Sequence, residues 1–529
     1  MDRINKTGIT AIASWIVFLT FSACTAHFED YNTNPVGVTA KELEQDFNHI
    51  GVYFPAVQQM IYCNYQWGEG TDWTFQRMQN LNADIWSGYM ASASLFGFEG
   101  IDNRTYFLQA GWNDAAWDYT YAHMMPNTLS IEKECRKNPD RYAHFEAINK
   151  ILKVLGISRI CDQYGPVIYT QYGQSKTAGV YDSAQDAYKA FFNDLKEAVA
   201  ILDEYIKENP GMTPFAKFDM AYAGNYTQWM KLANTLRLRL AMRVVKYDPV
   251  RAQTEAEAAM AAPGGVMTSN TENFTISGKG YFHPLAAISS WKDISIGADL
   301  ESILVGYDDP RIHRMATGVK GMRTGIPDLD SKDYHSLVSC VNSKSADPAV
   351  LVTAAEAYFL RAEGALRAWN MGGSAKNLYE TGIQTSFAQW GVPIEDYLTS
   401  ANVPADFTDQ LQPEIANTPA VSTITPNWDD ATTDEEKLEK IITQKWIAGF
   451  PEGQNAWAEW RRTGYPKLFP IIKNDSQGVI SSESGVRRLP FSSAEKYGNA
   501  EGIADAVEKL GGPDTGATRL FWDIDKTNF

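Results

Sequence analysis

The sequence predicts a mainly α-helical fold, in which TPR-like helix pairs form a scaffold and long irregular loops with a few short strands join them. Three observations support this class. Apolar residues recur at helical spacing from Thr39 onward, capping residues mark several helix starts, and alanine-rich segments occur where neighbouring helices would cross. The strict 34-residue repeat is absent, so an unrelated helical bundle remains the alternative.

Composition limits the classes of function. The chain has 529 residues, of which 21% are charged and 44% hydrophobic, as in ordinary globular proteins. Its net charge of −17 argues against nucleic acid and against an anionic membrane surface as partners. Aromatic residues are frequent, and flat rings are used both in cores and on sugar- or peptide-binding surfaces.

The N-terminus has the pattern of a bacterial lipoprotein signal. Two basic residues precede a largely apolar stretch, Ile9 to Ala23, that is too short for a comfortable membrane span. The tetrapeptide FSAC at 21–24 resembles a lipobox, with phenylalanine where leucine is usual. We expect residues 1–23 to be a signal peptide and a lipid on Cys24 to be the only membrane attachment. A cleaved secretory signal with an incidental cysteine, or a buried first helix, are the alternatives.

After this signal we expect a polar tether at 24–40 and a single domain at 41–529. The helix pairs lie within about 141–262 and 351–391. In the first region Ser183, Asn225 and Asp248 are the expected N-caps. Scattered cysteines without a CxxC motif are expected to be buried free thiols, and they are Cys63, Cys135, Cys161 and Cys340.

A further helix pair is predicted near the C-terminus. Thr433 and Glu436 have the spacing of a capping box, and the helix that they start ends at Gly449 before Pro451. A second helix then runs to Gly464. We expect its arginines to pair with carboxylates near the C-terminus. We also assign six tryptophans to the core, with Trp112 and Trp117 on a helix. The six are Trp86, Trp112, Trp117, Trp446, Trp457 and Trp460.

Three stretches without long helical patterns, 62–112, 264–350 and 391–432, are candidates for function, because loops of this length in a compact domain are usually functional. A sugar site needs flat rings together with carboxylates, amides or guanidinium groups. Residues 64–77, including Phe75, and 281–292, including Phe282, have that mixture. The candidate ligand-binding residues are Tyr65, Trp67, Asp72, Trp73, Arg77, Tyr281 and Trp291. Packing in the core is the alternative for each ring.

The sequence shows no catalytic constellation. Its histidines lack metal-ligand spacing, and there is no GxSxG elbow, phosphate-binding loop or EF-hand. We therefore expect a protein that is not an enzyme and needs no cofactor, while a bound metal ion is left open. Carboxylates such as Glu69, Asp72 and Asp84 could form a glycosidase pair, since that chemistry needs only two carboxyl groups at a set separation.

The segment KWIAGFPEGQNAWAEWRRTGYP at 445–466 resembles the C-terminal signature of SusD/RagB-like outer-membrane lipoproteins. The segments 76–90, 161–171, 229–243 and 378–392 are similar to parts of the same family in the same order. The resemblance implies a SusD-like fold on the cell surface, which binds nutrient oligosaccharide at loops of the two regions above. It also implies delivery to a TonB-dependent SusC-like channel. Peptide binding, a surface glycoside hydrolase and a structural surface protein remain the alternatives.

Overall fold

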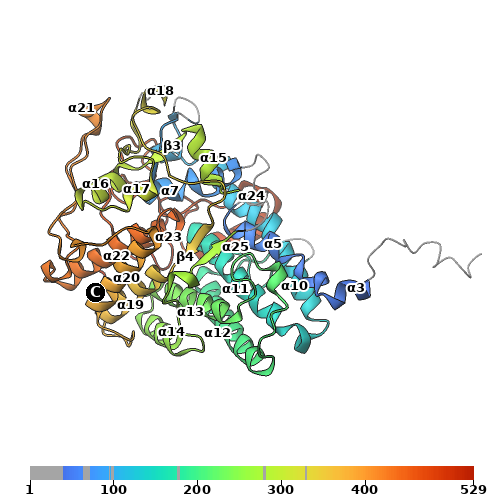
Figure 1. The fold of residues 1–529 in the computed structure, drawn as a ribbon. Helices are drawn as coiled ribbons and strands as arrows, with labels where there is room; N and C mark the ends of the chain where they lie inside the picture. The colour runs from blue at the N-terminus through green and yellow to red at the C-terminus, as the bar shows by residue number, and fades with distance from the viewer. Residues whose placement is uncertain are drawn as a thin grey trace, which may run out of the picture. The chain divides into compact units, whose positions relative to one another are not determined.

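The computed structural model of the protein describes residues 40–63, 72–94, 96, 100–175, 179–277, 282–327 and 331–529 (Figure 1). Its contacts divide the chain into two units, Met1–His49 and Ile50–Phe529. Within the described residues no helix is both long enough and apolar enough to cross a bilayer. Cys24 lies outside these residues, so the lipid anchor, the signal peptide and the predicted domain boundaries stay predictions.

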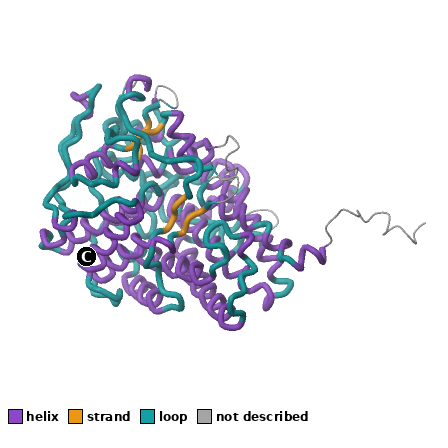
Figure 2. Tube along the Cα trace, viewed as in Figure 1, coloured by secondary structure: helices purple, strands orange, loops and turns teal. Residues whose placement is uncertain are grey.

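The second unit is built mainly from helices (Figure 2). Four long helices, α11 (Pro139–Tyr164), α12 (Ala184–Glu208), α13 (Tyr226–Arg243) and α14 (Pro249–Ala261), pack each against the next. The N-cap side chains of the last three are Ser183, Asn225 and Asp248, as predicted, and each accepts a backbone N–H in the first turn. The predicted helix pairs of this region are therefore confirmed, and α10 (Met125–Cys135) adds another helix against α11.

A second group of helices consists of α19 (Ala354–Leu366), α20 (Ala375–Trp390) and α22 (Asp434–Gly449). Helices α19 and α20 approach closely, since a Cβ on Gly382 of α20 would come 2.8 Å from the Phe359 ring of α19. Three alanines of the predicted alanine-rich segment, Ala354, Ala355 and Ala362, are fully buried. The helix expected from residue 351 starts at Ala354, because the preceding residues form strand β4 (Ala349–Val352).

The described parts of the three loop stretches contain short strands and short helices. Strand β1 (Met90–Ser92) pairs antiparallel with β3 (Ile294–Ile296), and β2 (Phe274–Ile276) pairs antiparallel with β4. The few short strands were predicted. A helix was predicted only at Trp112 and Trp117, which lie on two successive short helices, and the other helices were not. The helices include α6 (Asp72–Phe75), the π-helix η1 (Gln76–Asn80), α7 (Ala83–Trp86), α8 (Ala110–Asn113), α9 (Ala115–Tyr119), α15 (Pro284–Trp291), α16 (Ala298–Gly306) and α17 (Ile312–Met315).

The remaining elements are short helices, apart from the longer α25. They are α3 (Ala40–Gln45), α4 (Asn48–Gly51), α5 (Phe54–Ile61), η3 (Asn103–Thr105), η4 (Thr120–Met124), η5 (Ala216–Phe218), η6 (Asn270–Glu272), α18 (Ser331–Tyr334), η7 (Tyr397–Thr399), α21 (Pro413–Ala416), η8 (Trp428–Asp430), α24 (Ser493–Gly498) and α25 (Ala500–Leu510).

The predicted C-terminal helix pair is present. Thr433 and Glu436 form a reciprocal capping box at the start of α22, and α23 (Gly453–Thr463) ends at Gly464, whose φ is +80°. Four of the six tryptophans assigned to the core are buried, namely Trp86, Trp117, Trp446 and Trp457. The other two, Trp112 and Trp460, are half-buried. Trp460 is half-buried, so its assignment was wrong: its ring lies against Gly485, where a Cβ would come 2.8 Å from it.

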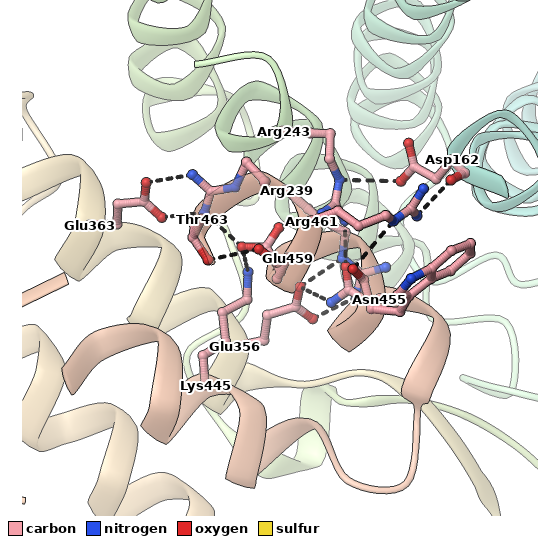
Figure 3. Close-up of polar contacts among 12 residues, drawn as sticks. Asp162, Arg239, Arg243, Glu356, Glu363, Lys445, Asn455, Glu459, Arg461 and Thr463 are labelled. Carbon is pink, nitrogen blue, oxygen red and sulfur yellow. Dashed lines mark hydrogen bonds and ion pairs between the residues drawn. The ribbon is translucent and has the colours of Figure 1, made fainter. Parts of the chain in front are cut away.

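A buried charge cluster joins α11, α13, α19, α22 and α23 (Figure 3). We define the charge cluster as Asp162, Arg239, Arg243, Glu356, Glu363, Lys445, Glu459 and Arg462. Glu459 lies at its centre, 2.6 Å from Arg243, 2.7 Å from Arg462 and 3.1 Å from Lys445. Burial alone would raise the pKa of Glu459, but these three cations outweigh it and hold the pKa well below its usual range.

The two arginines of α23 do not pair as predicted. Arg462 binds Glu363 on α19 at 2.7 Å, and Glu459 within its own helix. Arg461 lies over the Trp457 ring at 3.6 Å and donates to the carbonyls of Asp162 and Arg487. Among the described residues the cysteines are free thiols, of which Cys63, Cys135 and Cys161 are buried as predicted and Cys340 is half-buried.

Candidate ligand-binding site

The structure places the two predicted ligand segments next to each other. Helix α6, from the first segment, packs against α15, from the second, and the β1–β3 pair joins the chain just beyond them. Tyr62 contacts both helices. Its ring stacks on Phe75 of α6 with centroids 5.1 Å apart, and its hydroxyl lies 3.1 Å from Nε2 of His283, the N-cap of α15.

Large rings are exposed on these neighbouring elements. Trp73 on α6 is 39% exposed and Trp291, the last residue of α15, is 41% exposed. Beside α6, Trp112 of α8 is half-buried and meets Phe96 edge to face, with centroids 5.7 Å apart. We call Trp73, Phe96, Trp112 and Trp291 the aromatic platform. Exposed rings on neighbouring elements make this surface a candidate binding surface, because flat rings can stack on the apolar faces of a ligand.

Arg77 ties two parts of the aromatic platform together. Its guanidinium carbon lies 5.3 Å from the centroid of the Trp73 ring, which is within the range of a cation–π contact. One of its terminal nitrogens donates to the carbonyl oxygen of Gly111, the residue before Trp112. Arg77 therefore fixes the Trp73 ring relative to α8 while its remaining N–H groups can donate to a ligand.

Buried amides hold the backbone under the aromatic platform. The Asn82 amide donates to the carbonyl of Arg77 at 2.8 Å, and its oxygen accepts from Asn103. Asn103 also donates to the Asn113 side chain at 3.1 Å, at the end of α8. This row of three asparagines links η1 to α8, so the rings above it sit on a rigid base. A preformed surface loses little conformational entropy on binding.

The predicted site residues fall into three groups. Arg77 contacts Trp73, and Trp291 is the last residue of α15, which packs against α6. Tyr65, Trp67 and Tyr281 lie outside the described residues, and so does the side chain of Asp72. The prediction was wrong for Phe75, which is fully buried because its ring packs on Tyr62.

Sequence reasoning missed part of the aromatic platform. Trp112 was assigned to the core, but it is half-buried because its helix, α8, is only four residues long and lies at the surface beside Phe96. The neighbouring Gly111 was the available signal for an exposed turn here.

Asp84, the described member of the predicted carboxylate set, is not available to a ligand. Asp84 is fully buried and accepts hydrogen bonds from Gln79, Asn80 and the backbone of Gly453, and burial raises its pKa to about 7. This carboxylate joins α7 to α23 and does not face solvent. In the part of the chain that the structure describes, no group of three or more His, Cys, Asp or Glu side chains is placed to hold a metal ion.

Comparison with known families assigns the chain. The family model described as "Susd and RagB outer membrane lipoprotein" matches residues 30–523, which is nearly the whole sequence. The protein belongs to the SusD-like family. The family match confirms the resemblance found at 445–466. The mostly helical structure of this SusD-like chain is the family fold. Comparison with curated proteins finds no match.

Solved SusD-like structures are similar over their whole length. A chitin-binding SusD homologue from Flavobacterium johnsoniae is 46% identical, with a TM-score of 0.87, and the match covers 91% of this chain and 100% of that one. A SusD homologue from Bacteroides vulgatus is 43% identical, with a TM-score of 0.87 and coverages of 92% and 100%. One from Bacteroides thetaiotaomicron is 33% identical, with a TM-score of 0.82 and coverages of 90% and 99%.

Proposed function

We propose that this SusD-like protein is a lipid-anchored surface protein that binds a nutrient oligosaccharide at the aromatic platform and delivers it to a TonB-dependent SusC-like channel. The observation that carries the proposal is the pair of exposed rings, Trp73 and Trp291, on adjoining helices with Arg77 over one of them. Flat rings suit the apolar faces of sugars, and the guanidinium suits their hydroxyl groups.

The ligand class follows from the site and from one relative. The Flavobacterium johnsoniae homologue, at 46% identity, is described as chitin-binding. We therefore take chitin oligosaccharides, which are uncharged and carry apolar ring faces, as the first ligands to test. Peptide binding in the same type of uptake complex is the second candidate, and a surface glycoside hydrolase is the third.

The proposed role is binding without chemistry. The site as described offers stacking surfaces and hydrogen-bond donors, while the Asp84 carboxylate considered for hydrolysis is buried away from it. Residues 24–40 would act as the tether between the lipid on Cys24 and a single domain at 41–529, with the protein facing the cell exterior.

Isothermal calorimetry of the purified protein with chitohexaose tests the proposal. Trp73→Ala and Trp291→Ala should each weaken binding by roughly tenfold or more, as loss of a central aromatic contact does. Tyr497→Ala is the matched control, because Tyr497 is 90% exposed on α24. All three variants should keep the wild-type melting temperature. Undiminished affinity in both tryptophan variants would refute the platform as the site.

The alternatives have their own readouts. Binding of peptides but not of chitohexaose or other oligosaccharides would favour the peptide reading, and release of new reducing ends would reveal a hydrolase. Co-purification of a TonB-dependent channel from the native outer membrane tests the partner, and its repeated absence under mild detergent conditions would count against delivery.

A further inference from the structure

A large groove lies away from the aromatic platform, and the proposed function does not use it. Its volume is about 790 Å³, within the range of small-molecule sites. It is bounded by elements that are distant in sequence, namely the start of α13, the end of α20, η6, the β2–β4 pair, and the loops at 341–348 and 450–451. Figure 1 shows α13, α20 and β4 as neighbours in the middle of the helical scaffold.

The groove has a mixed lining of apolar and amide side chains and carries almost no charge. Amides from four separate elements line it, and they are Gln228, Asn270, Asn273, Asn342 and Gln389. Its one acidic residue, Asp347, accepts a hydrogen bond from the backbone N–H of Lys344 within its own turn, at 2.8 Å. Burial lowers the pKa of the lining His283 to about 4, so that imidazole is neutral at pH 7. In a chain with a net charge of −17, such a neutral surface is distinctive.

Several of these amides have hydrogen-bonding capacity to spare among the described contacts. Gln228 uses its amide N–H on the Thr271 carbonyl at 2.8 Å, which leaves its oxygen as an acceptor. Gln389 uses its amide oxygen, which accepts from Asn273 at 3.2 Å, and this leaves its NH₂ group as a donor. Because their other ends are already bonded, these side chains are held in fixed positions. A ligand that carries both hydrogen-bond donors and acceptors could therefore bond to Gln228 and to Gln389.

An aromatic ring completes the set of groups. Trp390, the last residue of α20, is half-buried and lines the groove beside Gln389. A flat ring next to oriented amides offers both stacking and hydrogen bonds, the same combination that the aromatic platform offers with Trp73 and Arg77. An anionic ligand would find no cationic partner among the lining residues, and a purely apolar ligand would leave the unbonded ends of Gln228 and Gln389 without a partner.

The groove and the aromatic platform are connected through one helix. His283 lines the groove and caps the N-terminus of α15, while Trp291 ends the same helix at the platform. Eight residues of helix span about 12 Å. The groove therefore meets the N-terminal end of α15, where the buried Tyr62 contacts His283, and the platform meets its C-terminal end.

From this geometry we infer that the groove between α13, α20 and β4 is a second binding site for an uncharged oligosaccharide, distinct from the aromatic platform. The inference rests on the proposed function, since it assumes that the protein binds glycans. A polymer held at both sites would dissociate more slowly than one held at either, because the second contact is made at high effective concentration.

A substitution that fills the groove with a larger side chain tests whether the groove binds saccharide. Ala388 lines it from an exposed position on α20, so Ala388→Arg should occupy the space without removing a core contact. Ala261→Arg is the matched control, at an exposed position on α14 that does not line the groove. Both substitutions are made in the wild type and in the Trp73→Ala/Trp291→Ala background. Chitotriose and chitohexaose are the probes, with calorimetry for tight binding and saturation-transfer NMR for millimolar binding.

The expected result is that the double tryptophan variant keeps weak chitotriose binding, which Ala388→Arg abolishes and Ala261→Arg does not. In the wild type, Ala388→Arg should weaken the binding of chitohexaose several-fold. It should leave the binding of chitotriose at the aromatic platform unchanged. Loss of every saturation-transfer signal in the double variant, or a residual signal that survives Ala388→Arg, would overturn the second site while leaving the platform intact. Absence of saccharide binding by the wild type would instead overturn both.

Discussion

The guanidinium of Arg77 lies over the indole of Trp73, 5.3 Å from the ring centroid, and donates to the carbonyl oxygen of Gly111. One side chain thus orients an exposed ring and anchors the helix that carries Trp112. We expect Arg77→Ala to weaken chitohexaose binding about tenfold, since a cation–π contact and a hydrogen bond together are worth roughly 1–2 kcal/mol. Calorimetry measures the change.

The control for this substitution is Arg141→Ala. Arg141 also lies 5.3 Å from a ring centroid, that of Tyr142, but on α11, outside the site. It should leave binding unchanged. Equal effects of the two variants, or an Arg77→Ala melting temperature many degrees below wild type, would show that Arg77 serves stability and not the site.

Glu459 is expected to be the most sensitive position of the charge cluster. Glu459→Gln leaves Arg243, Arg462 and Lys445 without their shared counter-charge, in a region where all four side chains are buried. Breaking a buried pair in this way costs about 3–5 kcal/mol. Urea unfolding of Glu134→Gln, which breaks an exposed pair with Lys137, should show a loss below about 1 kcal/mol. A similar loss in both variants would contradict this account.

Gly453 has no space for a side chain. A Cβ there would come 2.3 Å from Oδ1 of Asp84 and 2.6 Å from its Cα, and Asp84 accepts the Gly453 N–H at 3.1 Å. Gly453→Ala should therefore lower the free energy of unfolding by about 1–3 kcal/mol, through steric conflict between α7 and α23. Gly498→Ala, with nothing within 4 Å, is the matched helix-terminal control and should be nearly neutral.

Acid should destabilise the scaffold through His144. This side chain is buried against Tyr205, with centroids 4.1 Å apart, and burial lowers its pKa to about 3. The unfolded chain has a pKa near 6.5 at this position, so below pH 6.5 it takes up a proton that the folded protein does not. Stability therefore falls as the pH drops from about 6.5 toward 3, by about 2 kcal/mol at pH 5.

His144→Phe should remove that part of the pH dependence between pH 7.5 and 5, as measured by urea unfolding. His283, whose pKa is lowered to about 4, keeps a second contribution in the same direction. The His313→Phe variant, changed at an exposed position, should show the same pH dependence of the free energy of unfolding as the wild type. If His144→Phe also retains the full dependence, the protonation of His144 does not drive it.

The lipid anchor is tested by Cys24→Ser. We expect the variant to lose metabolic labelling by palmitate and to leave the membrane fraction, because the attached acyl chains are the proposed attachment. Cys340→Ser is the control, since Cys340 lies far along the chain and is a free half-buried thiol. Continued labelling of Cys24→Ser would refute the lipobox assignment.

Features set by neighbouring residues could be predicted from the sequence. The caps at Ser183, Asn225 and Thr433 depend on contacts within four residues, and all three are present. The exposure of a ring is different, because it depends on partners elsewhere in the chain. Phe75 is buried by Tyr62, and Trp112 remains half-exposed at the edge of α8.

Long-range pairing likewise escaped prediction. Arg462 pairs with Glu363 on α19 and not with the C-terminal carboxylates, because the packing of α19 and α22 brings α23 to that point. The groove was not foreseen for the same reason, since Gln228, Asn342 and Gln389 come from separate elements. The spacing of residues along the chain does not predict contacts between segments that are far apart in the sequence.

The position of Glu459 also bears on how the protein is made. Arg243 and Lys445 emerge from the ribosome before the carboxylate that neutralises both. A nascent chain that ends before α23 would have to bury these cations with less counter-charge, which is costly. We therefore expect stable folding of this region only after α23 has been synthesised, and such a delay would suit a polypeptide with the predicted secretion signal.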